Sequence, residues 1–249
     1  MDTQRGTPSF PPIDPSAADG MSAGAAMTPE LLAGLLADGD DELAAWALAN
    51  ALEQLPREQV YDGLLRDAMA LIGARWRDGT WGIAEEHAAT QALTRALDRL
   101  APPRGPLLRV GPVALVAGVR DERHTLGLVC LAHVLEEAGW SVVNLGGDEP
   151  ADDLARFVAQ MQPALVGLTA SNAERAGAVA ETVSAIRSVS LARPITIMLG
   201  GRLAADAEAV AGLAIDWTGT SLVAAADFAQ GLAERLTATG EVTPPGEVF

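Results

Sequence analysis

The sequence predicts two parts: an N-terminal four-helix bundle and a flavodoxin-like, Rossmann-type α/β domain with a five-stranded parallel sheet. Residues 28 to 103 are rich in alanine and leucine at helical spacing, which favours helices. From residue 107, short apolar runs alternate with longer amphipathic segments, as in strand–helix units. Because the apolar runs are almost continuous, we expect the strands to be buried on both faces of a parallel sheet.

The helical part shows clear start and stop signals. Thr28 suits an N-cap, and Pro29 follows it at the first helical position. The stretches "DGDD", "LPRE" and "RDGTWG" then interrupt the periodic pattern, so four helices are expected within residues 27–101. The composition of residues 102–106 predicts a linker to the second domain.

The second domain is expected over residues 107–237. Its five strands are predicted at "VALVAGV" from 113, "SVVNLG" from 141, "ALVGLT" from 164, "ITIMLG" from 195 and "AIDWTG" from 214. The segments between these runs are interpreted as helices that cover both faces of the sheet. The expected strand order is that of flavodoxin-like folds.

The ends of the chain and its composition indicate where in the cell the protein is found. Residues 1–26 hold few large apolar side chains and predict a disordered tail, and residues 238–249 predict a short C-terminal tail. The start of the chain lacks the apolar stretch of a signal peptide, and no apolar run is long enough to span a membrane. Cys130 is the single cysteine, which excludes an intrachain disulfide. We therefore expect a cytoplasmic protein.

The net charge of −16 argues against two kinds of partner. Direct DNA binding requires a basic face that displaces counterions from phosphates. Docking on an anionic membrane surface requires basic residues as well. The sequence therefore predicts no direct contact with DNA or with a membrane.

Unusual residues follow the predicted strands at the edge where ligands of parallel sheets bind. They offer an imidazole, hydroxyl groups and glycines that allow a bulky ligand to approach the backbone. These candidates are Glu122, Arg123, His124 and Gly127 after the first strand, Thr169 and Ser171 after the third, Gly200 and Gly201 after the fourth, and Gly219 and Thr220 after the fifth.

This set of residues lacks the parts of most catalytic sites. The sequence shows no glycine-rich phosphate fingerprint after the first strand, no Ser-His-Asp arrangement and no HxxxH or CxxC metal spacing. A large ligand that contains a metal fits the residues better, with His124 as a ligand of that metal. Glu122 is placed to accept a hydrogen bond from the other ring nitrogen of His124, which fixes the tautomer.

Residues 107–237 resemble a cobalamin-binding domain, whose pattern is DxHxxG, then SxL or SxT, then GG. This sequence has Glu122-x-His124-x-x-Gly127, Thr169-x-Ser171 and Gly200-Gly201. The resemblance implies that His124 replaces the dimethylbenzimidazole base below cobalt and that the nucleotide tail enters the sheet edge. Glu122 in place of Asp keeps the carboxylate, and Thr169 in place of Ser keeps the hydroxyl.

The helical part resembles the cap of light-sensing cobalamin regulators of the CarH type. In "ARWRDGTWGIAEEHAAT", Trp76 precedes the pair Glu86-His87 by the spacing of that family. The resemblance implies that Trp76 and Glu86 contact the 5′-deoxyadenosyl group of adenosylcobalamin. Trp81 is interpreted as bundle core.

Two departures from that family are visible. The family's tetrameric repressors have a histidine directly after the tryptophan, which becomes the upper cobalt ligand after illumination; here that position is Arg77. His87 or water would then take the upper position. The repressors also carry an N-terminal DNA-binding domain, where this sequence has an acidic leader, so we expect signalling to a transcription factor or another protein, as in antirepressors of the AerR kind.

Several functions remain open on the sequence. The favoured one is a non-enzymatic light sensor that binds adenosylcobalamin, with hydroxocobalamin and methylcobalamin as alternative cofactors. The runner-up is a methyl-carrying corrinoid protein of a methyltransferase system, followed by a passive cobalamin-binding module. A cobalamin mutase fits least, because the sequence shows no substrate-binding barrel. The remaining histidine, His133, falls inside a predicted helix and is interpreted as structural.

Overall fold

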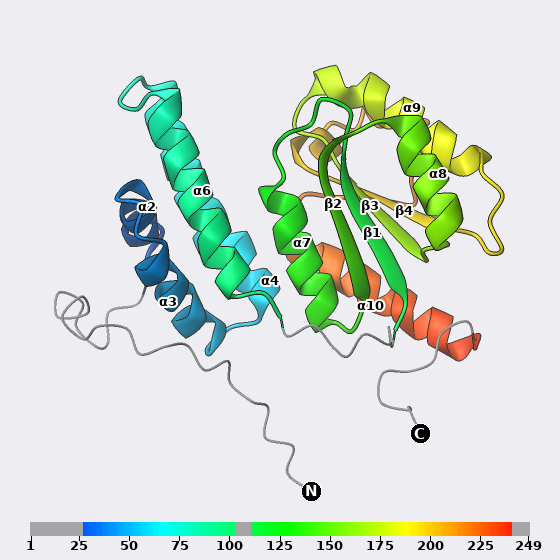
Figure 1. The fold of residues 1–249 in the computed structure, drawn as a ribbon, viewed down its shortest axis with the longest axis horizontal. Helices are drawn as coiled ribbons and strands as arrows, with labels where there is room; N and C mark the ends of the chain where they lie inside the picture. The colour runs from blue at the N-terminus through cyan, green and yellow to red at the C-terminus, as the bar shows by residue number, and fades with distance from the viewer. Residues whose placement is uncertain (1–26, 103–110, 241–249) are drawn as a thin grey trace, which may run out of the picture.

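The structure, a computed structural model, describes residues 27–102 and 111–240 and consists of a helical part and a sheet part (Figure 1). The predicted tail 1–26, linker residues 103–106 and residues 241–249 lie outside the described residues. Among the described residues, no helix is long and apolar enough to cross a membrane.

Four helical rods form the N-terminal part, and the third contains one π-helical turn. The elements are α2 (Pro29–Ala37), α3 (Asp41–Leu52), the continuous run of α4 (Arg57–Val60), η1 (Tyr61–Leu65) and α5 (Arg66–Arg77), and α6 (Ile83–Arg99). As predicted, Thr28 caps α2, its Oγ accepting from Leu31 N at 3.3 Å. Asp40 caps α3 in the same way. The buried side chains are mostly leucine and alanine, so the core follows the helical spacing of the sequence.

The second part is a five-stranded sheet, and each pair of neighbouring strands is parallel. Its strands are β1 (Val113–Val119), β2 (Ser141–Glu149), β3 (Leu165–Thr169), β4 (Thr196–Gly200) and β5 (Trp217–Thr218). Their order is β2-β1-β3-β4-β5, which confirms the flavodoxin-like prediction. The longer helices of this part are α7 (Leu126–Glu137), α8 (Ala151–Met161), α9 (Ala176–Ser188) and α10 (Leu222–Ala238).

The connection between β4 and β5 differs from the prediction. Where a helix was expected, the chain forms a short 3₁₀ turn, η3 (Arg202–Ala205), followed by further turns. Asp206 accepts hydrogen bonds from the backbone N–H groups of Glu208 and Ala209, which competes with helical hydrogen bonding. Gly212 then adopts a φ of +77°, in the left-handed region. The predicted helix is therefore wrong here, and β5 is much shorter than its apolar run.

The elements stack in layers that bring the bundle near one side of the sheet. Helices α8 and α9 cover one face of the sheet, and α7 and α10 cover the other. The bundle packs on the outer side of α7 and α10, where Cys130 and Val134 of α7 join the bundle core. Figure 1 shows the start of α6 and the loop after β1 toward the same end of the molecule.

Candidate functional site

The loop after β1 holds a buried carboxylate beneath an exposed imidazole. The side chain of Glu122 is 1% exposed and that of His124 is 76% exposed. Glu122 Oε1 lies 2.6 Å from His124 Nδ1 and accepts from the backbone N–H of His124 at 2.8 Å. Its Oε2 accepts from the backbone N–H of Ser171, after β3, at 2.5 Å. Glu122 therefore orients His124 and joins two loops at the sheet edge.

The protonation state of Glu122 suits this role. Burial raises the pKa of its carboxyl, but the hydrogen bonds from Ser171 and His124 lower it more, so the pKa lies below the ordinary value for glutamate. The carboxylate is thus ionised at neutral pH, and in the tautomer with the ring proton on Nδ1 it accepts a hydrogen bond from that nitrogen. The Nε2 lone pair of His124 is then the one that can bind a metal ion.

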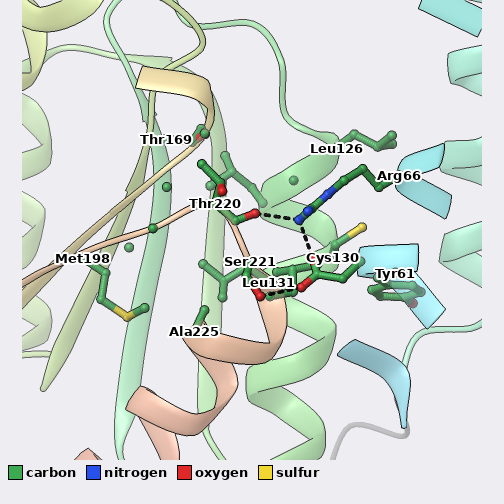
Figure 2. Close-up of a pocket in the computed structure, with 18 of the residues that line it drawn as sticks. Tyr61, Arg66, Leu126, Cys130, Leu131, Thr169, Met198, Thr220, Ser221 and Ala225 are labelled. Carbon is green, nitrogen blue, oxygen red and sulfur yellow. Dashed lines mark hydrogen bonds and ion pairs between the residues drawn. The ribbon is translucent and has the colours of Figure 1, made fainter. Parts of the chain in front are cut away.

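A cavity of about 270 Å³ opens beside this loop, between the sheet, α7, α10 and the π-helical turn of the bundle (Figure 2). Six of the predicted site residues line it. They are Gly127, Thr169, Gly200, Gly201, Gly219 and Thr220. Residues that are more than 90 positions apart in the sequence therefore meet around one space, as the strand-end argument predicts.

The cavity depends on a glycine at position 201. Gly201 has a φ of +83°, and a Cβ there would lie 2.3 Å from the carbonyl oxygen of Ala170. It would also lie 2.8 Å from Thr169 Oγ1. A Cβ at Gly127, which also lines the cavity, would meet nothing within 4 Å. Gly201 is thus required by the backbone, whereas Gly127 keeps space open.

The remaining predicted residues lie outside the cavity lining. Ser171 is tied to Glu122 through its backbone, and Arg123 is exposed. In the helical part, Trp76 lies in the last turn of α5 and is 50% exposed, while Glu86 and His87 lie near the start of α6. His87 Nε2 is 3.6 Å from Glu86 Oε2, and the side chain of His87 is 71% exposed. Trp76 and the pair Glu86-His87 thus lie on either side of the connection between α5 and α6. Trp81 packs partly against the bundle core.

Sequence reasoning missed the contribution of the bundle to the cavity. The residues concerned are Tyr61, Asp62, Leu65, Arg66 and Met69. The four-residue spacing of Asp62 and Arg66 is a local signal for an ion pair, but nothing local indicates their contact with the start of α10. His133, predicted to be structural, is buried in α7, and its Nδ1 lies 3.0 Å from the hydroxyl of Tyr61.

Both parts of the chain match known families. Residues 112–226 match a family described as the B12 binding domain, and residues 30–101 match a second family with the same description.

Curated relatives fall into two groups. The chain is 31% identical to the HTH-type transcriptional repressor CarH of Myxococcus xanthus over 168 residues, which are 66% of this chain and 54% of the repressor. It is 26% identical to trimethylamine corrinoid protein 1 of Methanosarcina mazei over 141 residues, which are 54% of this chain and 64% of that protein. The chain therefore spans about half the length of the repressor and less than two thirds of the corrinoid protein.

A solved structure supports the fold. The monomethylamine corrinoid protein of Methanosarcina barkeri matches 81% of this chain and 96% of its own with a TM-score of 0.67, at 16% identity. A likeness at this identity bears on the fold alone, and it agrees with the observed order of helical part and sheet. The two family matches lead to one conclusion: both parts of this chain, residues 30–101 and 112–226, are B12-binding domains.

Proposed function

We propose that this protein binds a cobalamin with His124 below the cobalt, in place of the dimethylbenzimidazole base, and reports the state of the upper ligand to a partner protein. The observation that carries the proposal is the buried Glu122 beneath the exposed His124, at the edge of a glycine-lined cavity. A carboxylate behind a histidine is the usual support of a metal-binding imidazole, because it fixes the tautomer and raises the basicity of the free nitrogen.

The size of the cavity fits one part of the ligand. Pockets that enclose a whole drug-sized ligand have volumes of about 300–1,000 Å³. At about 270 Å³ the cavity is too small for a corrin ring but suits the nucleotide arm that base displacement releases. Gly127, Gly200 and Gly219 let that arm approach the backbone, and Gly201 keeps the bend after β4. Thr169 and Thr220 line the same cavity and would offer hydroxyl groups to the arm.

The α5–α6 end of the bundle supports the upper-face assignment. Trp76 leaves half of its surface exposed, whereas Trp46 and Trp81, the other tryptophans of the described bundle, are less exposed. Glu86 and His87 lie in the same region, with Glu86 Oε1 also accepting from Thr90 Oγ1 at 2.9 Å. In the proposal, Trp76 shields the upper ligand, Glu86 contacts it, and His87 or water replaces it once it leaves.

The light response follows from the choice of upper ligand. Bound adenosylcobalamin supplies a cobalt–carbon bond that light breaks. The protein's own part is to hold the ligand, shield its upper group and change the packing of the bundle when that group leaves. The 31% identity to a transcriptional repressor supports a regulatory rather than an enzymatic role, with a transcription factor as the expected partner.

A methyl-carrying corrinoid protein is the second candidate. The 26% identity to trimethylamine corrinoid protein 1 favours it. In that role the α5–α6 end of the bundle would move aside so that a partner methyltransferase reaches the ligand. Trp76 would then serve as a removable cover.

The test compares absorption spectra in the dark and after green light. The wild type, His124→Ala and Glu122→Gln are each mixed with adenosylcobalamin, and Arg120→Ala is the control because Arg120 pairs with Glu181 away from the cavity. We expect a base-off, histidine-bound spectrum for the wild type and the control, with irreversible conversion by light. His124→Ala should lose that spectrum, and Glu122→Gln should bind about 10–100-fold more weakly. A wild-type spectrum unchanged by light, with methylcobalamin bound equally well, would instead favour the methyl carrier.

A further inference from the structure

The bundle contributes to the site in two places. One is the α5–α6 end, and the other is a wall of the cavity at the sheet edge, which we call the lower cavity. The wall consists of the π-helical turn and the first residues of α5. Among the described residues that line the cavity, Arg66 is the one cation and Asp62 is the one anion. The other lining residues are apolar or uncharged, so a charged group on a ligand in this cavity meets Arg66 and Asp62 first.

Arg66 reaches from α5 across to the loop after β5, as Figure 2 shows. Its Nη2 donates to the carbonyl oxygen of Thr220 at 2.6 Å and forms an ion pair with Asp62. Its Nε and Nη1 make no hydrogen bond to residues within the described ranges 27–102 and 111–240. The side chain is 48% exposed. The guanidinium is therefore fixed at one nitrogen and keeps donors for another group.

Asp62 divides its carboxylate between Arg66 and the start of α10, since Oδ1 pairs with Arg66 and Oδ2 has other partners. Asp62 Oδ2 accepts from Ser221 Oγ at 2.7 Å and from the backbone N–H of Val223 at 3.0 Å. The carboxylate thus sits at the N-terminus of α10, where the helix dipole favours negative charge. Asp62 neutralises this helix end and anchors Arg66, so the guanidinium is held in place before any ligand binds.

We propose that Arg66 binds the phosphodiester of the nucleotide arm and so makes the bundle a specificity element of the lower site. The proposal rests on the proposed function, since cobalamin supplies the phosphodiester. An anion that leaves water for a cavity requires a cation or several hydrogen-bond donors. A guanidinium provides both in a planar arrangement that matches phosphate oxygens.

The experiment compares three corrinoids that differ in the arm. Cobalamin carries the whole nucleotide, cobinamide phosphate carries a phosphate without the base, and cobinamide carries neither. Affinities are measured for the wild type, Arg66→Met and Arg66→Lys. Arg75→Met is the control, because Arg75 lies on the same helix and stacks over Trp81, 5.1 Å from the ring centroid, outside the cavity lining.

We expect Arg66→Met to lose about tenfold or more in affinity for cobalamin and cobinamide phosphate while its affinity for cobinamide stays close to that of the wild type. Arg66→Lys should lose less, and Arg75→Met should match the wild type. Cobinamide binding also reports that each variant is folded.

Two results would overturn the assignment in different ways. An equal loss for all three corrinoids in Arg66→Met would show that Arg66 only holds the loop after β5 in place. If the wild type bound none of the three, the proposed function would fail, and the assignment of Arg66 would fail with it.

Discussion

Two glycines of the cavity have opposite surroundings although both line the same space. Position 201 requires glycine, because its φ is +83° and a Cβ there would lie 2.3 Å from the carbonyl oxygen of Ala170. Gly127 lies at the start of α7, and a Cβ there meets nothing within 4 Å. Gly201 thus allows the backbone conformation of the loop after β4, and Gly127 leaves space in the cavity that a side chain would fill.

Alanine substitutions should separate these two roles. Gly201→Ala should lower the free energy of unfolding by about 1–3 kcal/mol, because the residue keeps a left-handed conformation and gains a backbone clash. Gly127→Ala should leave stability unchanged or raise it by up to about 1 kcal/mol, since alanine favours the helix. The same change should weaken cobalamin binding, because its methyl group enters the cavity. Chemical denaturation and ligand titration of both variants test this; equal stabilities would contradict it.

How much of the site the sequence reveals depends on how local the contacts are. Glu122 and His124 are two positions apart, so their pairing followed from spacing and elementary metal chemistry. Arg66 and Thr220 are 154 positions apart, and their contact exists only after the bundle docks on α10. No periodicity in the sequence encodes that docking, so the bundle wall of the cavity was not predictable.

At the scale of elements, the π-helical turn η1 directs two neighbouring side chains to two helices of the other domain. Tyr61 meets His133 of α7, and Asp62 meets the start of α10. Such turns occur often at functional sites, because the wider turn changes which residues face a partner. Here the turn lets consecutive residues contact the domain that carries the sheet.

The Asp62 contact should give the protein an acid-sensitive contribution to stability. Burial raises the pKa of Asp62, but hydrogen bonds from the backbone of α10 and from Ser221, together with the charge of Arg66, lower it below the ordinary value. A depressed folded-state pKa stabilises the fold above the unfolded pKa, about 3.9 for aspartate, and this stabilisation is lost as the pH falls through the folded pKa.

Asp62→Asn should therefore be less stable than the wild type at pH 7, by about 1.5–3 kcal/mol, since hydrogen bonds to a charged group are lost. The difference should shrink when the pH falls below about 4. Urea denaturation of both proteins across this range measures it. Asp152→Asn, at an exposed position in the first turn of α8, is the control. A difference between Asp62→Asn and the wild type that stays constant with pH would contradict this account.

The elements differ in how well the sequence predicts them. Strand β1 is a run of apolar residues that is almost fully buried, and its prediction is confirmed residue for residue. The segment between β4 and β5 has a helical composition, yet it forms a 3₁₀ helix and turns. Asp206 accepts hydrogen bonds from backbone N–H groups there, and Gly212 adopts a left-handed conformation. The π-helical turn escapes prediction as well, because one wider turn hardly alters the apolar spacing of a helix.

At the scale of the whole molecule, a second polar contact joins the bundle to the sheet domain. Arg57 donates from Nε to Glu137 at 2.6 Å and from Nη1 to the hydroxyl of Tyr61 at 2.9 Å. The same hydroxyl lies 3.0 Å from His133 Nδ1, and the side chains of Tyr61 and His133 are buried. Bundle and sheet domain should therefore unfold together, because their interface contains buried polar groups that lose partners on separation.

Tyr61→Phe tests this coupling. Removal of the hydroxyl should cost about 1–3 kcal/mol and speed amide hydrogen exchange in α7 and in the adjoining part of the bundle. Exchange in α8 and α9, on the far face of the sheet, should change no more than global stability requires. Tyr61→Phe with exchange rates equal to those of the wild type would show that apolar packing alone holds the two parts together.

Helix α5 also fixes a length. It begins at Arg66, beside the lower cavity, and Trp76 is the next-to-last residue of the same uninterrupted helix. At 1.5 Å per residue the two positions are about 15 Å apart along the axis. A ligand that contacts both Arg66 and Trp76 must extend over that distance, so the length of α5 sets the size of ligand that can reach both residues. Cobinamide, which lacks the phosphate and the nucleotide, would therefore contact the Trp76 position but not Arg66.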